Sequence, residues 1–208
     1  MQQNKNLCDR EHITKTSLYN KWAPRQLDAF SDFAKTTFRD GALSRKEKEL
    51  IAIGCAHVLQ CPYCIDYHVD LARKAAASNE EIAEAAWVGI FVASVSTYEL
   101  SIVTTRTLEG TDGEANDLLD DINRRFDRLS DSCLEDGVLK RQFKLLIATS
   151  CAHNISSGAL AEQYMLSATE SGQSKNVISE AIWVAIEMAG GACFGHSGLT
   201  AALLEEVE

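Results

Sequence analysis

The sequence is poor in the residues that interrupt helices, since its 208 residues include only two prolines and twelve glycines. It also lacks runs of alternating apolar and polar residues bounded by turn residues, the pattern that indicates β-strands. Alanine, leucine, isoleucine and glutamate are abundant instead, and these residues favour helices. The sequence therefore predicts an all-α protein.

Three further absences restrict the function. The formal net charge is −10 and basic residues form no cluster longer than a triplet, which argues against nucleic acid and anionic membrane surfaces as partners. No stretch approaches 18 uninterrupted apolar residues, and the first residues lack the apolar core of a signal peptide. The seven cysteines are scattered and odd in number, unlike the disulfide framework of a secreted protein. We therefore expect a cytoplasmic location, with no membrane or nucleic acid bound.

One short stretch contains the residues best suited to chemistry. Proline is tolerated at the first position of a helix and keeps the residue before it out of the α region. We therefore expect a helix from Pro62 to about Ala76, with Cys61 as its N-cap. Cys64 and His68 lie four residues apart and so share one helix face. Both sulfurs would lie at the positive end of the helix dipole, which favours a thiolate over a thiol.

Glu49 belongs to the same candidate site. It lies on a preceding apolar helix, roughly residues 46–59, which must fold back on the next helix to bring Glu49 close. Together, Glu49, Cys61, Cys64 and His68 could move protons, bind a metal or attack an oxidant.

The rest of the chain divides into helical segments. Residues 1–12 are polar and predict a loose arm, whereas residues 16–38 predict a helix interrupted near Pro24. A long apolar helix is expected over residues 82–108, followed by a linker at residues 110–113.

The second half of the chain repeats the first when it is shifted, without a gap, by 96 residues. Matching positions include Gly41 with Gly137, Leu50-Ile51-Ala52 with Leu146-Ile147-Ala148, Cys55-Ala56-His57 with Cys151-Ala152-His153, and Trp87 with Trp183. We infer a tandem duplication. The predicted units are an N-terminal arm and helices (1–39), repeat 1 with the paired cysteines (40–110), a linker and connecting helix (111–135) and a degenerate repeat 2 (136–208).

The differences between the repeats point to the functional residues. The positions of Glu49, Cys61, Cys64 and His68 hold Leu145, Ser157, Leu160 and Tyr164 in the second repeat. Four polar groups that are lost together suggest a set that works together, with the second repeat as a scaffold. Residues present in both repeats are expected to be structural. On this basis we expect His57 and His153 to bond backbone carbonyls or face a subunit, Cys55 and Cys151 to be small buried residues, and Trp87 and Trp183 to lie in the core.

His196 does not fit this division. It follows Gly190-Gly191-Ala192 in the second repeat, where the first repeat has Leu100. One hypothesis is that His196 reaches the cysteine site of repeat 1 or of a neighbouring subunit. The alternative is a surface or interface histidine.

The pattern Glu-x11-Cys-x2-Cys-x3-His resembles the AhpD-like superfamily, which includes the alkylhydroperoxidase and carboxymuconolactone decarboxylase families. The flanking words Gly41-Ala42-Leu43-Ser44 and Ser78-Asn79-Glu80-Glu81-Ile82 strengthen the resemblance. It covers residues 40–109 and, as a degenerate copy, residues 136–205. It implies an AhpD-like helical fold and a thiol-dependent peroxidase or disulfide reductase without a bound cofactor.

The resemblance also implies roles for the residues of the site. Cys64 would be the attacking thiolate, His68 would take its proton, and Glu49 would orient the imidazole through a water. A peroxide would leave a sulfenic acid on Cys64, Cys61 would resolve it to a disulfide, and an external dithiol would restore the pair. The residues alone do not fix which cysteine attacks.

Two departures from the family pattern bear on this activity. A relay histidine stands between the cysteines of the alkylhydroperoxidase, where this chain has Tyr63, so the relay would be shorter. Classical carboxymuconolactone decarboxylases lack the paired cysteines, which counts against lactone decarboxylation.

Alternatives from other classes remain. Cys61, Cys64, His68 and Glu49 could instead form a metal-binding or redox-sensing module, although structural zinc sites usually take two separated Cys or His pairs. A lactone- or acid-transforming enzyme with incidental cysteines is the third possibility. The resemblance further implies a homo-oligomer, with a trimer favoured and a dimer as the alternative, and its partners would be a peroxide and a thiol reductant.

Overall fold

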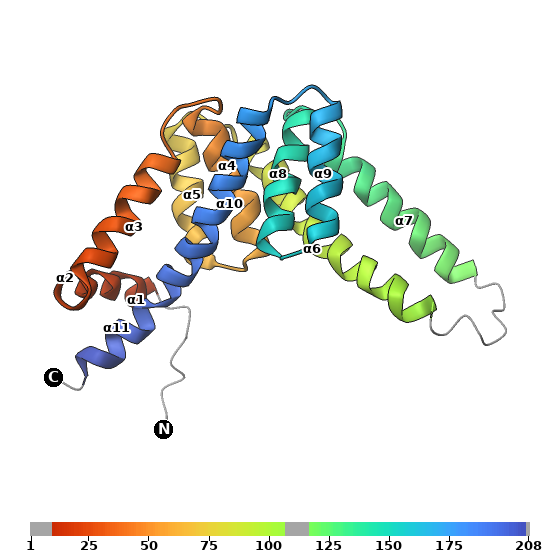
Figure 1. Ribbon diagram of the computed structural model, residues 1–208. Coiled ribbons are helices and arrows are strands. Elements are labelled where there is room, and N and C mark those ends of the chain that lie inside the picture. Colours follow the sequence, from red (N-terminus) through yellow and green to blue (C-terminus); the bar gives the residue numbers. More distant parts are fainter. Residues whose placement is uncertain (1–9, 107–116, 207–208) are drawn as a thin grey trace.

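The computed structural model describes residues 10–106 and 117–206, and all regular structure within them is helical (Figure 1). This confirms the expected all-α class. The described elements are α1 (Arg10–Thr14), the 3-10 helix η1 (Lys15–Leu18), α2 (Tyr19–Trp22), α3 (Pro24–Thr37), α4 (Arg45–Val58), α5 (Pro62–Lys74), α6 (Asn79–Arg106), α7 (Asp117–Leu134), α8 (Arg141–Asn154), α9 (Gly158–Glu170), α10 (Lys175–His196) and α11 (Gly198–Glu205).

Side-chain caps fix the starts of the two helices that carry the candidate site. The Ser44 hydroxyl accepts the Glu47 N–H, and the Glu47 carboxylate accepts the Ser44 N–H at 2.7 Å, so α4 begins with a capping box. The Cys61 sulfur accepts the Cys64 N–H at 3.2 Å and caps α5 in the predicted way. The expected starts of α4 and α5 are therefore confirmed to within one residue.

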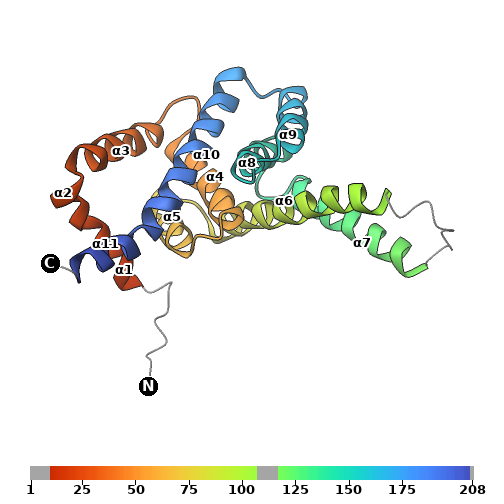
Figure 2. The same cartoon turned by 60° about the horizontal axis from the view of Figure 1, so that its bottom comes forward.

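The N-terminal region is more ordered than expected. The predicted break at Pro24 is confirmed, but residues 10–12, predicted as part of a loose arm, belong to α1. The reason is tertiary packing: α11 approaches so closely that a Cβ at Gly198 would collide with the His12 carbonyl oxygen. Helices α1 to α3 and α11 thus lie together on one side of the molecule (Figures 1 and 2). Residues 1–9 and the predicted linker at 110–113 lie outside the described residues.

Helices α4 and α8 form the centre of the molecule. Helix α4 packs against α5, α6, α8 and α10, and α8 packs against α6, α9 and α10. Between α4 and α6 the backbones nearly touch, because a Cβ at Gly89 would lie 2.4 Å from the Gly54 carbonyl oxygen. The end of α6 and the start of α7 extend away from this centre, opposite α1 to α3 (Figure 2).

A carboxylate of the second half holds a loop of the first half. Glu180 on α10 accepts the backbone N–H groups of Ala42 at 2.8 Å and Leu43 at 3.0 Å. It also forms an ion pair with the buried Lys48 at 3.0 Å. A Cβ at Gly41 would displace the Glu180 carboxylate, which explains a glycine at that position.

The reverse contact has the same geometry. Glu84 on α6 accepts the N–H groups of Val138 at 3.0 Å and Leu139 at 2.9 Å, and pairs with the buried Lys144 at 3.0 Å. Each of these residues lies 96 positions from its counterpart in the first contact. We call the two contacts together the reciprocal clamp.

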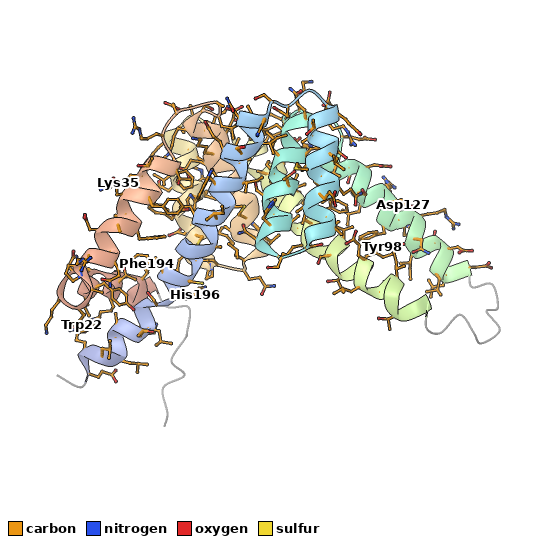
Figure 3. All side chains as sticks on the ribbon, viewed as in Figure 1. Trp22, Lys35, Tyr98, Asp127, Phe194 and His196 are labelled. Atoms are coloured by element: carbon orange, nitrogen blue, oxygen red, sulfur yellow. A yellow bond between two sulfur atoms is a disulfide. The ribbon has the colours of Figure 1, made fainter. Side chains whose placement is uncertain are left out.

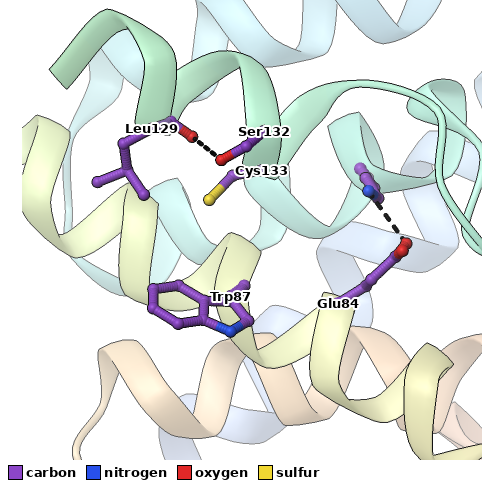
Figure 4. A pocket seen from close by; sticks show the side chains of 6 residues that line it. Glu84, Trp87, Leu129, Ser132 and Cys133 are labelled. Carbon is purple, nitrogen blue, oxygen red and sulfur yellow. Dashed lines mark hydrogen bonds and ion pairs between the residues drawn. The ribbon is translucent and has the colours of Figure 1, made fainter. Parts of the chain in front are cut away.

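Two surface pockets are lined by residues that correspond through the same shift of 96 positions. The first, of about 220 Å³, is lined by Glu84, Trp87, Leu129, Ser132, Cys133 and Lys144 (Figure 4). Their six counterparts, Glu180, Trp183, Phe33, Thr36, Thr37 and Lys48, line a second pocket of about 490 Å³. Helices α3 and α7 therefore occupy corresponding places. These contacts support a duplication, and the division at residues 40, 111 and 136 stays a prediction.

The prediction that Trp87 and Trp183 lie in the core is wrong. Each side chain is 53% exposed. Their helices are apolar on most sides, so the sequence pattern does not show which face is covered. The two indole side chains line the two surface pockets instead.

Two segments of the described chain, Asn79–Ile102 and Lys175–Glu205, are long and apolar enough to cross a membrane. Length and composition alone are a weak indication, because core helices of soluble proteins pass the same test. Both segments contribute to the packing around α4 and α8.

The reciprocal clamp predicts a measurable loss of stability. Glu180→Gln and Glu84→Gln each remove the partner of a buried lysine and one of two accepted backbone hydrogen bonds. We expect each to lower the free energy of unfolding by about 1–3 kcal/mol in chemical denaturation. Glu162→Gln, at an exposed position on α9, is the matched control and should change stability little.

The clamp should also make stability fall in acid. Burial acts to raise the pKa of Glu84 and Glu180, but the accepted backbone N–H groups and the lysines bring each pKa below its usual value. A lowered folded-state pKa means that the stabilisation is present above the unfolded pKa and is lost as pH falls through the folded one. The double Gln variant should therefore lose less stability between neutral pH and acid than wild type. An unchanged acid dependence would contradict the clamp.

Candidate functional site

Glu49 and His68 are in direct contact. Glu49 lies on α4 with its side chain fully buried, and His68 lies on α5, also buried. The Nδ1 atom of His68 is 2.7 Å from Oε2 of Glu49, and the Arg45 guanidinium pairs with Oε1 of Glu49 at 2.5 Å. The expected water between Glu49 and the imidazole is thus not needed. Arg45 connects the buried Glu49–His68 pair to the protein surface, because the Arg45 side chain is 40% exposed.

The contact with Glu49 determines which nitrogen of the neutral His68 ring carries the hydrogen. A carboxylate paired with an arginine accepts hydrogen bonds, so Nδ1 of His68 carries the hydrogen and donates it to Glu49. The Nε2 atom then holds the free lone pair. The ring is further held by Phe38, which stacks on it with centroids 5.3 Å apart. Glu49 and Phe38 therefore hold the His68 ring in one orientation, with Nε2 as the ring nitrogen that does not contact Glu49.

The two cysteines of the motif lie together at the start of α5. The sulfurs of Cys61 and Cys64 are at disulfide distance, with Cα atoms 5.3 Å apart. Both residues are buried, and Cys64 is slightly more accessible than Cys61. The N-terminal position places them where unpaired helix N–H groups stabilise a thiolate.

A cavity of about 410 Å³ opens onto Cys64 and His68. Its wall is formed by α1, η1, α3, α5 and α10, together with Phe38 and Arg45. Most of the lining is apolar, and the aromatic rings of Phe30 and Phe194 contribute to it with centroids 5.6 Å apart. Phe194 faces the N-terminal helices (Figure 3). The site is thus assembled from both ends of the chain.

Tyr63 and His196 meet beside this cavity. Their rings pack edge to face with centroids 5.5 Å apart, and Gly195 lies beside the Tyr63 ring. His196 is exposed at the end of α10, whereas Tyr63 is buried and lines the cavity. The second half of the chain therefore reaches the cysteine helix within one molecule. His196 itself is not among the residues that line the cavity.

Sequence reasoning missed Glu187. This residue lies on α10, is buried, and lines the same cavity as Cys64 and His68. The signal was present, because Glu187 is a lone carboxylate in the apolar run from Ala181 to Ala189. The same register comparison that found the other differences places Phe91 at the corresponding position.

The histidines and the buried cysteines that both halves share make the expected structural contacts. Nδ1 of His57 bonds the Ile53 carbonyl and Nδ1 of His153 bonds the Thr149 carbonyl, both at 2.8 Å. Cys55 is fully buried, as is Cys151. Burial, followed by the neighbouring Cys151, raises the pKa of the Cys55 thiol well above its ordinary value.

The geometry can also be compared with the metal-binding alternative. In the described residues, no group of three or more His, Cys, Asp and Glu side chains is arranged to hold a metal ion. Of the four candidate ligands, Cys61 and Cys64 face each other while His68 turns Nδ1 to Glu49.

Comparison with known proteins agrees with this geometry. A family model described as "Carboxymuconolactone decarboxylase family" matches residues 24–101, a range that begins with α3 and includes the whole cysteine motif. The curated protein "Uncharacterized protein 4 in cox locus" of Paracoccus denitrificans is 43% identical over 86 residues, which cover 41% of this chain and 78% of that protein. The chain belongs to the carboxymuconolactone decarboxylase family. Membership in this family, together with the helices described above, confirms the AhpD-like fold.

The site predicts which thiols react in the native, reduced protein. Cys193 is exposed, whereas Cys55 and Cys133 are buried and burial raises the pKa of both thiols. A raised pKa leaves less thiolate at neutral pH, and the thiolate is the form that alkylates. We expect iodoacetamide to label Cys64 and Cys193, with Cys55 and Cys133 labelled only after denaturation. Peptide mass spectrometry reads this directly, and labelling of native Cys55 as fast as Cys193 would contradict it.

Proposed function

We propose that this member of the carboxymuconolactone decarboxylase family is a thiol-dependent oxidoreductase that reduces an organic hydroperoxide at Cys64. The observation that carries the proposal is the combination of two sulfurs at disulfide distance with an oriented base at one cavity. The cavity gives Cys64 and His68 access to a small molecule. The mostly apolar lining favours an organic peroxide over hydrogen peroxide.

The reaction begins with the transfer of the Cys64 proton to Nε2 of His68. The Cys64 thiolate attacks the terminal peroxide oxygen, so that an S–O bond forms while the O–O bond breaks. The leaving alkoxide takes up a proton and departs as an alcohol. Cys64 is then a sulfenic acid, and the Cys61 thiol displaces its oxygen as water to form the disulfide.

The buried ion pairs suit the base role of His68. As the imidazole becomes an imidazolium, the positive charge forms next to the Glu49 carboxylate, which stabilises it. Arg45 pairs with Oε1 of Glu49 and leaves Oε2 to His68. Reduction of an external disulfide would use the same groups, with a thiolate in place of the alkoxide as the leaving group.

The remaining parts of the proposal concern partners. The reductant is an external dithiol, which exchanges with the Cys61–Cys64 disulfide and needs no bound cofactor. We propose a cytoplasmic location, where such dithiols are kept reduced. We also propose a homo-oligomer, with a trimer favoured over a dimer. Exposed Trp87 and Trp183 offer apolar surface for contacts between subunits.

The proposal predicts a stoichiometric loss of thiols. One equivalent of cumene hydroperoxide should consume two thiols of the reduced protein and leave a Cys61–Cys64 disulfide that a dithiol reverses. His68→Gln keeps a hydrogen-bond donor for Glu49 but cannot take a proton, so we expect thiol oxidation to slow by about 10²-fold or more. His153→Gln, which removes the structural histidine of the other half, is the matched control and should react like wild type.

Other outcomes would favour the other classes of function. No loss of thiols, with stoichiometric zinc in the same sample, would mean that the four residues are metal ligands. A lactone- or acid-transforming activity that survives Cys61→Ser together with Cys64→Ser would mean that the cysteines are incidental. Either result would overturn the redox proposal.

A further inference from the structure

Glu187 is a buried carboxyl with an unsatisfied oxygen at the reaction cavity. Only 6% of the residue is exposed, and Oε2 has no hydrogen-bond partner among the described residues. It lines the cavity together with Cys64 and His68, although it comes from α10 in the second half of the chain. A buried polar atom without a partner is unfavourable unless water or a ligand satisfies it.

The surroundings of Glu187 favour its protonated form. Burial is the main cause that raises the pKa of this carboxyl, and the nearby negative charge of Glu49 raises it further, while His68 acts in the opposite direction. A carboxylic acid donates a hydrogen bond, whereas a carboxylate only accepts. Glu187 can therefore present a proton to a molecule bound beside Cys64.

The other half of the chain provides an internal comparison. At the position that corresponds to Glu187 it has Phe91, which is 2% exposed and packs on Phe126 with ring centroids 6.1 Å apart. Gly191, next to Glu187 on the helix face, corresponds to Val95. The other half thus replaces the carboxyl with a ring and the adjacent glycine with a larger side chain.

The replacement of Glu187 accompanies the loss of the rest of the site. Cys64 corresponds to Leu160 and His68 to Tyr164, and both replacements are buried. The surrounding aromatic pair is kept, because Tyr98 and Phe126 on one side match Phe194 and Phe30 on the other. Since the same packing is achieved with an apolar residue, the fold does not require a carboxyl at position 187. The carboxyl is present only where the thiols and the base are present.

We propose that Glu187 is the general acid of the site and gives its proton to the alkoxide that leaves when the Cys64 thiolate cleaves the O–O bond of an alkyl hydroperoxide. The inference rests on the proposed function. In this step the S–O bond forms, the O–O bond breaks, and the proton moves from Glu187 to the alkoxide oxygen. The imidazolium of His68, which holds the former Cys64 proton, then reprotonates Glu187. The peroxide is reduced to an alcohol and Cys64 is oxidised to a sulfenic acid.

The test compares peroxides whose leaving groups differ in basicity. Alkoxide from tert-butyl hydroperoxide is strongly basic and needs a proton, whereas acetate from peracetic acid is a weak base and leaves without one. Single-turnover oxidation of the reduced protein is followed for wild type and Glu187→Gln, which keeps the side-chain shape but has no acidic proton. We expect the rate with tert-butyl hydroperoxide to fall at least about tenfold in Glu187→Gln, and the rate with peracetic acid to change less than about twofold.

Two further variants complete the test. Glu187→Asp keeps an acidic proton and should retain part of the rate with tert-butyl hydroperoxide. A purely structural role of the longer Glu187 side chain would not explain that retained rate. Glu162→Gln removes an exposed carboxyl on α9 and should match wild type with both peroxides.

Each contrary result has its own meaning. If Glu187→Gln slows both peroxides equally, or slows neither, Glu187 is not the acid and this inference fails, while the reaction of wild type keeps the proposed function. If reduced wild type reacts with neither peroxide, the proposed function itself fails, and the acid role fails with it.

Discussion

The reciprocal clamp is the contact on which the rest of the structure depends. Glu180 holds the loop before α4, and Glu84 holds the loop before α8, so each half of the chain fixes the start of the central helix of the other. Helix α4 carries Glu49, while α10, anchored through Glu180, carries Glu187. The relative position of the helices that carry these two groups is thus fixed in part by contacts outside the cavity. A site whose members come from different halves needs such an anchor, because small shifts of its groups reduce catalysis.

The same framework holds two different interiors. On one side Cys64 and His68 line a cavity, with Cys61 and Glu49 buried next to them, and on the other side Leu145, Tyr164 and Leu160 are buried. Burying Glu49 is unfavourable by itself and is offset by Arg45 and His68. The apolar side shows that the helices pack well without such charges. The polar groups are therefore best explained by chemistry at the cavity.

The sequence predicts local features well where a residue type favours one local structure for a single physical reason. Cys61 as N-cap and Pro62 at the first helical position located the start of α5, and the 96-residue register identified His57 and His153 as structural. Tertiary choices were harder to predict. An apolar helix with no polar face does not show that Trp87 is exposed, and the pattern of residues 10–38 does not show that α1, η1 and α3 line the cavity beside the cysteine helix. Glu187 was missed because its partners lie far away in the sequence, although its counterpart Phe91 was visible.

The central claim is that Cys64 is the atom that meets the oxidant, and trapping its sulfenic acid tests this most directly. In Cys61→Ser the resolving thiol is absent, so the oxidised sulfur cannot close a disulfide with its neighbour. One equivalent of cumene hydroperoxide in the presence of dimedone, followed by peptide mass spectrometry, shows which sulfur was oxidised. The account predicts a dimedone adduct on Cys64, and none on Cys61 in the Cys64→Ser variant. An adduct on Cys61 in Cys64→Ser, together with no adduct on Cys64 in Cys61→Ser, would contradict it.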